Sequence, residues 1–134
     1  MCCDIRIASD DARFGLPEVG IGMVPTAGGT QTMPRLVWPG MYTAPILTGE
    51  IINAAEALRI GLVNRVVTRT SLLFAAEDMA RKIMSRSQTA VRYAKAAISR
   101  GLDLPLEQGL EMERELFAIV LSTVGAGAPT YPTS

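Results

Sequence analysis

The chain has 134 residues, 49% of them hydrophobic, a size and composition that suit one domain with a modest core. Its 13 basic and 13 acidic residues balance, so the charge favours neither a nucleic acid nor an anionic membrane as a partner. Cys2 and Cys3 are adjacent and no histidine is present, so the composition predicts neither a disulfide framework nor a metal site.

The start of the chain does not read as a secretion signal, because Asp4 and Arg6 interrupt the apolar stretch that such a signal needs. No run of about 18 apolar residues occurs anywhere, so we expect no membrane partner. Free thiols suit a reducing compartment, and the predicted location is cytoplasmic. A mitochondrial protein that has lost its targeting peptide is the alternative.

Two short segments rich in β-branched residues, 3–8 and 62–67, predict strands. Between them, Gly28-Gly29-Thr30 can open a helix that runs toward Leu36, because helix N-termini offer free N–H groups. Residues 1–70 are therefore expected to form an α/β region.

A helix start is predicted at Asn53, which can act as an N-cap. Glu56 follows three residues later, as in a capping box, and Gly61 marks the stop. These three positions predict one short helix.

From Ser71 onward the apolar pattern has the three- and four-residue steps of helices. One helix is expected over residues 71–84 and another from Thr89 to Arg100, ending at Gly101; Pro105 then begins a third. Core or subunit packing is the expected role of residues 71–123, and the apolar positions are Leu72, Leu73, Ala76, Met79, Ala80, Ile83, Met84, Leu106, Leu110, Leu116, Phe117, Val120 and Leu121.

The stretch at residues 14–31, Phe-Gly-Leu-Pro-Glu-Val-Gly-Ile-Gly-Met-Val-Pro-Thr-Ala-Gly-Gly-Thr-Gln, holds one carboxylate, Glu18, between apolar neighbours. Leu16, Pro17 and Val19 should partly desolvate it, which suits a group that moves protons at neutral pH. The alternative is a surface turn with a solvated Glu18 and a glycine pair that only caps a helix. The residues alone favour this alternative.

This stretch, together with Cys-Asp-Ile-Arg-Ile-Ala at residues 3–8 and Leu-Thr-Gly-Glu-Ile-Ile-Asn-Ala-Ala-Glu-Ala-Leu-Arg-Ile-Gly-Leu-Val-Asn-Arg-Val-Val at 47–67, closely resembles the C-terminal half of the enoyl-CoA hydratase/isomerase (crotonase) family. The resemblance extends to Thr123, with the segments in the family's order and spacing. It implies an α/β fold of the ClpP/crotonase spiral type, present as a fragment with a helical C-terminal subdomain at residues 71–123.

The resemblance also implies site residues. Glu18 matches one of the family's two acids, and the backbone N–H of Thr26 matches a donor to the catalytic water. Leu16, Val24 and Phe117 are the expected substrate contacts, although Phe117 taken alone favours packing. The implied partners are an acyl-CoA thioester and further copies of the chain in a trimer or hexamer. No separate cofactor is implied, because coenzyme A is part of the substrate.

Departures from the family pattern predict a truncated, inactive chain. The second glutamate and the donors to the thioester oxygen belong to segments that would precede Cys3. Residues 38–40 (Trp-Pro-Gly) and Pro45 fall where the family has a continuous helix, and an interior proline costs about 3 kcal/mol. Residues 124–134, rich in Gly, Pro, Ser and Thr, predict a disordered tail.

The predicted ancestral activity is the addition of water to 2-enoyl-CoA thioesters. A double-bond isomerase is the enzymatic alternative, because a single glutamate at the position of Glu18 can carry a proton between carbons. A non-catalytic, self-associating remnant is the third interpretation.

Overall fold

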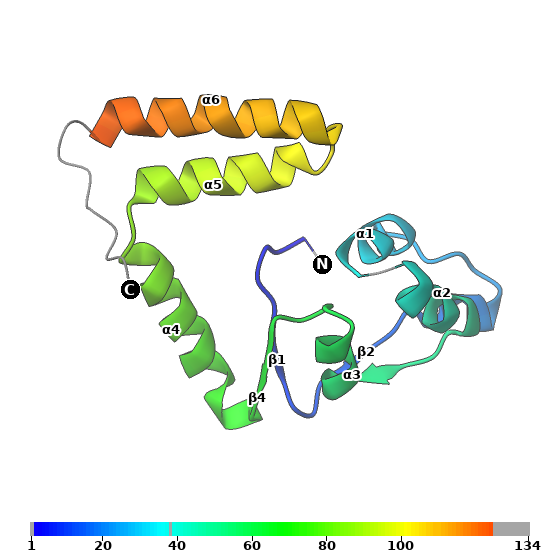
Figure 1. Cartoon of the computed structure of the whole chain (residues 1–134). Coiled ribbons are helices and arrows are strands. Elements are labelled where there is room, and N and C mark those ends of the chain that lie inside the picture. The colour runs from blue at the N-terminus through cyan, green and yellow to red at the C-terminus, as the bar shows by residue number, and fades with distance from the viewer. Residues whose placement is uncertain (1, 38, 125–134) are drawn as a thin grey trace. The chain divides into compact units, whose positions relative to one another are not determined.

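The computed structural model describes residues 2–37 and 39–124, and the segment predicted to be a disordered tail lies outside these ranges except for Val124. The chain divides into two compact units, residues 1–79 and 80–134, and each is described by itself. Figure 1 labels the elements of both units. No helix within the described ranges is long and apolar enough to cross a bilayer.

Both predicted strands form, but they are shorter than their sequence patterns. Strand β1 (Ile7–Ser9) pairs in parallel with β4 (Arg65–Val67), with Ile7 opposite Arg65. Ahead of β1, the Arg6 N–H donates to Asn64 Oδ1 at 2.8 Å and the Asn64 N–H donates to the Arg6 carbonyl at 2.8 Å. The side chain of Asn64 thus replaces a ladder bond, so the regular strands begin only beyond this point.

A second pair of strands was not predicted from the sequence. Strand β2 (Arg13–Phe14) runs antiparallel to β3 (Ile52–Asn53), with Phe14 opposite Ile52. Each strand has two residues, which is too short to show the alternation that marks a strand in sequence.

Two helices follow the residue 14–31 stretch, and both contain a proline. Helix α1 spans Gly29–Leu36 with Pro34 inside, and α2 spans Pro39–Thr48 with Pro45 inside. Helix α2 is continuous through Pro45, whose missing N–H leaves one bond of the helix unmade. Near the end of α2 the Thr48 hydroxyl donates to the Ala44 carbonyl at 2.8 Å.

The short helix α3 (Ala54–Arg59) confirms the predicted cap and stop. Asn53 Oδ1 accepts the Glu56 N–H at 2.9 Å, and Gly61 has a φ of 80°, the left-handed conformation that ends many helices. The reciprocal bond of a capping box is replaced, because the Glu56 carboxylate pairs with Arg59 instead.

The buried core of the first unit surrounds α3. Leu62 and Val63, predicted as strand, leave α3 in a tight turn in which both of their N–H groups donate to the Ala57 carbonyl. Leu62 and Val63 are therefore held by this turn and by burial of their side chains, and they do not pair as a strand. The core cluster consists of Ala8, Met33, Val37, Ile46, Ile52, Ala57, Ile60, Leu62 and Val63.

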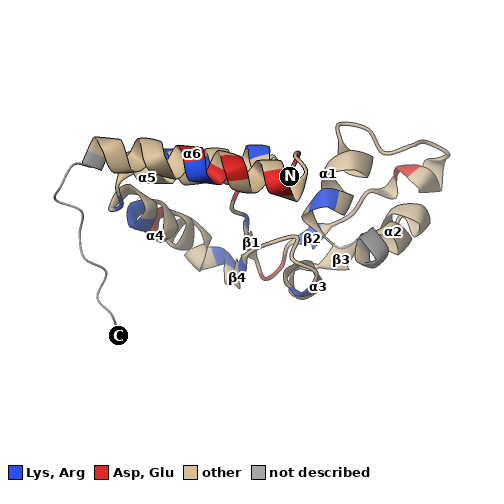
Figure 2. Cartoon of the chain, turned by 45° about the horizontal axis from the view of Figure 1, so that its top comes forward, with Lys and Arg blue, Asp and Glu red and all other residues tan. Residues whose placement is uncertain are grey.

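The helical part of the chain comprises η2 (Arg69–Ser71), α4 (Leu72–Met84), α5 (Gln88–Gly101) and α6 (Leu106–Val124). The predicted helices are confirmed with small shifts at their ends, and Ser87 caps α5. Helices α5 and α6 lie side by side (Figure 1), and acidic residues recur along α6 with a basic residue among them (Figure 2). The two helices meet closely where Gly101 faces Gly109.

Candidate active site

Glu18 lies on a short 3-10 helix, η1 (Pro17–Ile21). Pro17 occupies its first turn, where a missing N–H costs nothing. The helix ends at Gly22, whose φ of 74° is left-handed, and the Met23 N–H donates to the Glu18 carbonyl at 3.0 Å. The backbone of Glu18 is therefore fixed at both ends by residues suited to those positions.

The carboxylate of Glu18 is the one buried side-chain group without a hydrogen-bond partner among the described residues. The residue is half-buried, and its Oε2 atom is shielded from solvent with no donor to it. Burying such an acceptor without a partner costs free energy, and orphaned groups of this kind occur at catalytic positions. One carboxylate oxygen of Glu18 is thus removed from solvent and stays free of protein donors among the described residues.

The turn that carries Thr26 has a strained backbone. Ala27 has a φ of 53°, the one left-handed non-glycine residue among those described, and Gly28 follows with a φ of 86°. The Gly29 N–H donates to the Thr26 carbonyl at 3.0 Å, while the N–H of Thr26 itself donates to no acceptor in the described part of the chain. The turn therefore presents a backbone donor ahead of α1.

Leu16 connects the Glu18 segment to this turn. A Cβ built on Gly29 would lie 2.9 Å from Leu16 Cδ1 and 3.4 Å from Pro25 Cβ, so the Leu16 side chain rests against the start of α1. Gly29 is glycine because the leucine occupies the space that a side chain would need.

The remaining predicted substrate contacts, Val24 and Phe117, are both largely exposed. Val24 is 71% exposed and lines none of the described cavities. Phe117 belongs to the second unit, where it is 63% exposed and lines a groove of about 470 Å³ between α5 and α6 with Tyr93 and Leu116. Their roles toward a substrate stay predictions.

Comparison with known proteins decides the family. A model of the enoyl-CoA hydratase/isomerase family matches residues 1–128. The chain belongs to the enoyl-CoA hydratase/isomerase family.

Named relatives agree with this assignment. The chain is 46% identical over 123 residues to a crotonyl-CoA hydratase of Syntrophomonas wolfei and 50% identical over 123 residues to a short-chain-enoyl-CoA hydratase of Clostridium acetobutylicum; each match covers 92% of this chain and 47% of the relative. The crystal structure of an enoyl-CoA hydratase from Bacillus anthracis superimposes with a TM-score of 0.84 at 44% identity, over 87% of this chain and 45% of that one. The chain therefore has the crotonase fold over about half the length of these relatives.

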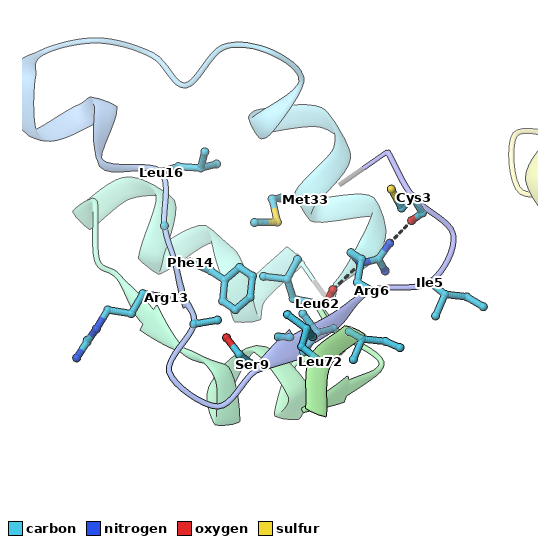
Figure 3. Close-up of a pocket in the computed structure, with 15 residues that line it drawn as sticks. Cys3, Ile5, Arg6, Ser9, Arg13, Phe14, Leu16, Met33, Leu62 and Leu72 are labelled. Carbon is cyan, nitrogen blue, oxygen red and sulfur yellow. Dashed lines mark hydrogen bonds between the residues drawn. The ribbon is translucent and has the colours of Figure 1, made fainter. Parts of the chain in front are cut away.

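The largest of the described cavities does not include Glu18. It was not predicted from the sequence. It has a volume of about 650 Å³ and lies between β1, β2 and α1, with Phe14, Met33 and Leu62 pointing toward one another across it (Figure 3). Arg6 lies at its edge, where Nε donates to the Leu62 carbonyl at 2.6 Å. Because residues from four separate segments form it, no local sequence pattern could have indicated it.

A metal site is not part of this arrangement. Within residues 2–37 and 39–124, no three Cys, Asp or Glu side chains cluster closely enough to hold an ion.

Proposed function

We propose that this chain carries one half of the acid/base machinery for adding water to a 2-enoyl-CoA thioester. Membership of the enoyl-CoA hydratase/isomerase family supports the reaction class. The single observation that carries the role of Glu18 is its buried, unpartnered Oε2 in the Phe-Gly-Leu-Pro-Glu segment. A carboxylate oxygen kept free of protein donors is available to a reacting water.

In the proposed mechanism, the Glu18 carboxylate and a second glutamate outside this chain hold the attacking water. The water oxygen bonds to C3 of the substrate as one of its O–H bonds breaks, and a proton reaches C2, so the elements of water add across the double bond. Thr26 directs its free N–H at the water oxygen. Leu16, Val24 and Phe117 are the proposed contacts to the acyl part of the substrate.

Isomerisation of the double bond is the second candidate function. The observation that favours it is that Glu18 is the one buried carboxylate left without a partner among the described residues. A single carboxylate can take a proton from one carbon and return it to another, so isomerisation does not need the second acid that hydration uses.

We propose further that the chain does not turn over substrate by itself. Loss of one donor to a developing oxyanion typically costs about 2.7–4 kcal/mol of transition-state stabilisation, and such donors lie outside the matched half. The exposed apolar face of α6, including Leu110, Phe117 and Leu121, supports self-association, with a homo-oligomer as the proposed state and a non-catalytic remnant as the alternative role. The two free cysteines support the cytoplasm as the proposed location.

Product analysis tests the proposal. The assay supplies crotonyl-CoA to the chain alone and to a chimera in which the unmatched half of the Clostridium acetobutylicum relative precedes it. We expect 3-hydroxybutyryl-CoA from the chimera and negligible product from the chain alone. In a second assay the chimera receives 3-butenoyl-CoA. A folded chimera that converts it to crotonyl-CoA but forms no 3-hydroxybutyryl-CoA would replace hydration by isomerisation. Turnover by the chain alone would contradict the proposed inactivity.

A further inference from the structure

The carboxylate of Glu18 depends on its backbone for its position. Its Oε2 atom has no hydrogen-bond partner among the described residues, so no bond to this oxygen fixes where it lies. The residue sits on η1, and a 3-10 helix has poorer hydrogen-bond geometry than an α-helix. Such a short helix needs support from its neighbours. The elements that pack against η1 should therefore determine the position of the carboxylate.

A fixed turn follows helix α2. Gly49 has a left-handed φ of 70°, and the Glu50 N–H donates to the Pro45 carbonyl at 3.1 Å. These two features together form a common C-terminal cap of helices. Ile51 follows and leads into β3, which pairs with β2. The turn at residues 49–51 is therefore held by α2 at one end and by a strand pair at the other.

Gly49 faces the two residues that flank Glu18. A Cβ built on Gly49 would lie 3.5 Å from Pro17 Cα and from Val19 Cγ2, and 3.6 Å from the Pro17 carbonyl oxygen. These are ordinary van der Waals distances, so one added carbon would touch η1 and a longer side chain would press on it. Helix α2 and η1 also pack against each other. The absence of a side chain at Gly49 thus leaves room for η1 against the turn.

Gly15 makes a closer approach to the same turn, ahead of Glu18 in the chain. A Cβ there would lie 3.0 Å from Ile51 Cγ1, 3.2 Å from the Glu50 carbonyl oxygen and 3.3 Å from Ile51 Cα. Two of these three atoms belong to the backbone, which cannot turn aside as the end of a side chain can. One turn therefore contacts the segment before Glu18 at Gly15 and after it at Val19.

We infer that Gly49 and Gly15 are positioning residues: the absence of their side chains lets the turn at residues 49–51 hold η1 where the Glu18 carboxylate meets the reacting water. This inference rests on the proposed function of Glu18. A misplacement of about 1 Å can cost about a hundredfold in rate, so a side chain at either glycine should lower kcat. It should leave KM nearly unchanged, because neither glycine is a proposed substrate contact.

Paired substitutions test the inference in the chimera of this chain with the unmatched half of the Clostridium acetobutylicum relative. Gly49→Asn adds a side chain against η1, whereas Gly61→Asn adds one where a Cβ meets no atom within 4 Å. Both glycines are left-handed and follow a helix, a position that asparagine tolerates, so both variants should fold. For Gly49→Asn we expect kcat with crotonyl-CoA to fall at least about tenfold, with KM within about twofold. Gly61→Asn should match the unchanged chimera.

A second pair of variants tests the contact at the other glycine. Gly15→Ala places a methyl group against the backbone of the turn, and Gly20→Ala places one in open space on η1. The first should lower kcat as Gly49→Asn does, and the second should leave it unchanged. Val19→Ala loosens the same contact without adding an atom, so it tests the inference even where an added side chain prevents folding. We expect its kcat to fall at least about fivefold at an unchanged KM.

Hydrogen exchange on the 134-residue chain itself tests the contact without turnover. The Met23 N–H donates to the Glu18 carbonyl at 3.0 Å, so its exchange with deuterium follows the opening of η1. In Gly49→Asn and Gly15→Ala we expect Met23 to exchange at least about fivefold faster than in the unchanged chain. In Gly61→Asn the rate should stay the same.

Three outcomes would overturn the inference: equal kcat for Gly49→Asn and Gly61→Asn, a rise in KM at unchanged kcat, or a loss of kcat with unchanged Met23 exchange. A chimera that hydrates no crotonyl-CoA, combined with the expected exchange rates, would reject the proposed function and keep the support of η1 by the turn. Normal hydration by every variant would keep the proposed function and reject the positioning role.

Discussion

The region around α3 and the α5–α6 pair differ in where their apolar side chains lie. Around α3, Ala57 and Leu62 are almost completely buried and nine residues form one core cluster. In α5 no residue is buried, and in α6 large apolar side chains such as Leu106 and Phe117 are exposed.

The difference teaches that helix formation and core formation are separable in this chain. Helices α5 and α6 form from amphipathic sequence and pack on each other, but they leave their apolar stripe uncovered. The α3 region is held by a core cluster that joins segments distant in sequence, such as those of Ala8 and Leu62. We therefore expect stability to reside mainly around α3 and association to depend mainly on the α5–α6 pair.

The largest expected effect on stability comes from Leu62→Ala. Removal of a buried leucine side chain should lower the free energy of unfolding by about 2–5 kcal/mol, through lost burial and the cavity left behind. Leu110→Ala on α6 is the matched control, since Leu110 is 43% exposed. Urea unfolding followed by circular dichroism measures both, and equal losses would remove the contrast between the regions.

Gly29→Ala tests the contact between Leu16 and the start of α1. The added methyl would lie 2.9 Å from Leu16 Cδ1, the end of a side chain that can turn aside, so we expect a loss of at most about 1 kcal/mol in the free energy of unfolding. Gly20→Ala is the control, because a Cβ there meets no atom within 4 Å. Leu16→Ala combined with Gly29→Ala should recover part of the loss; failure to do so would mean that the two residues do not oppose each other.

Helix caps compare the two regions on a smaller scale. Asn53→Ala should cost about 1 kcal/mol, because it removes the 2.9 Å acceptor for the Glu56 N–H. Ser87→Ala at the start of α5 should cost less, because that cap bond is 3.3 Å long. The same urea titration ranks them, and the reverse order would contradict the account.

The smallest expected effect depends on pH. The pKa of Asp11 is lowered from 3.8, first by a hydrogen bond from Ser9 and then by Arg69. A carboxylate whose pKa is lower in the folded state stabilises the fold at pH values above its pKa in the unfolded state. This contribution is lost as the pH falls through its pKa in the folded state. Melting temperatures from about pH 5 to about pH 3 should therefore fall slightly less for Asp11→Asn than for the unchanged chain. An identical pH dependence would show that the interactions of Asp11 contribute nothing.

Local sequence signals predicted the parts of the fold that depend on local chemistry. Asn53 and Gly61 set the ends of α3 as expected, and the helical stripes of residues 71–121 form helices. The two-residue strands, the cavity beside β1 and the turn at Leu62 could not be predicted, because each depends on segments that meet only in the folded chain.

The features of the candidate site also divide into those that the local sequence predicted and those that it could not. The apolar flanks of Glu18 predicted its partial burial, and the glycine pair predicted the start of α1. The left-handed Ala27 and the contact of Leu16 with Gly29 carry no sequence signal of their own, because alanine and leucine fit many conformations. The role of Thr26 as a backbone donor to the catalytic water comes from the resemblance to the family, and it stays a prediction.

The most direct test of the proposed function is the steady-state kcat of the chimera for crotonyl-CoA hydration, with and without Glu18→Gln. Glutamine keeps the size and hydrogen-bonding capacity of the side chain but cannot accept the proton, so kcat should fall by at least about a hundredfold while the melting temperature changes little. Comparable kcat values for the two proteins would remove Glu18 from the mechanism and return it to the role of a turn residue.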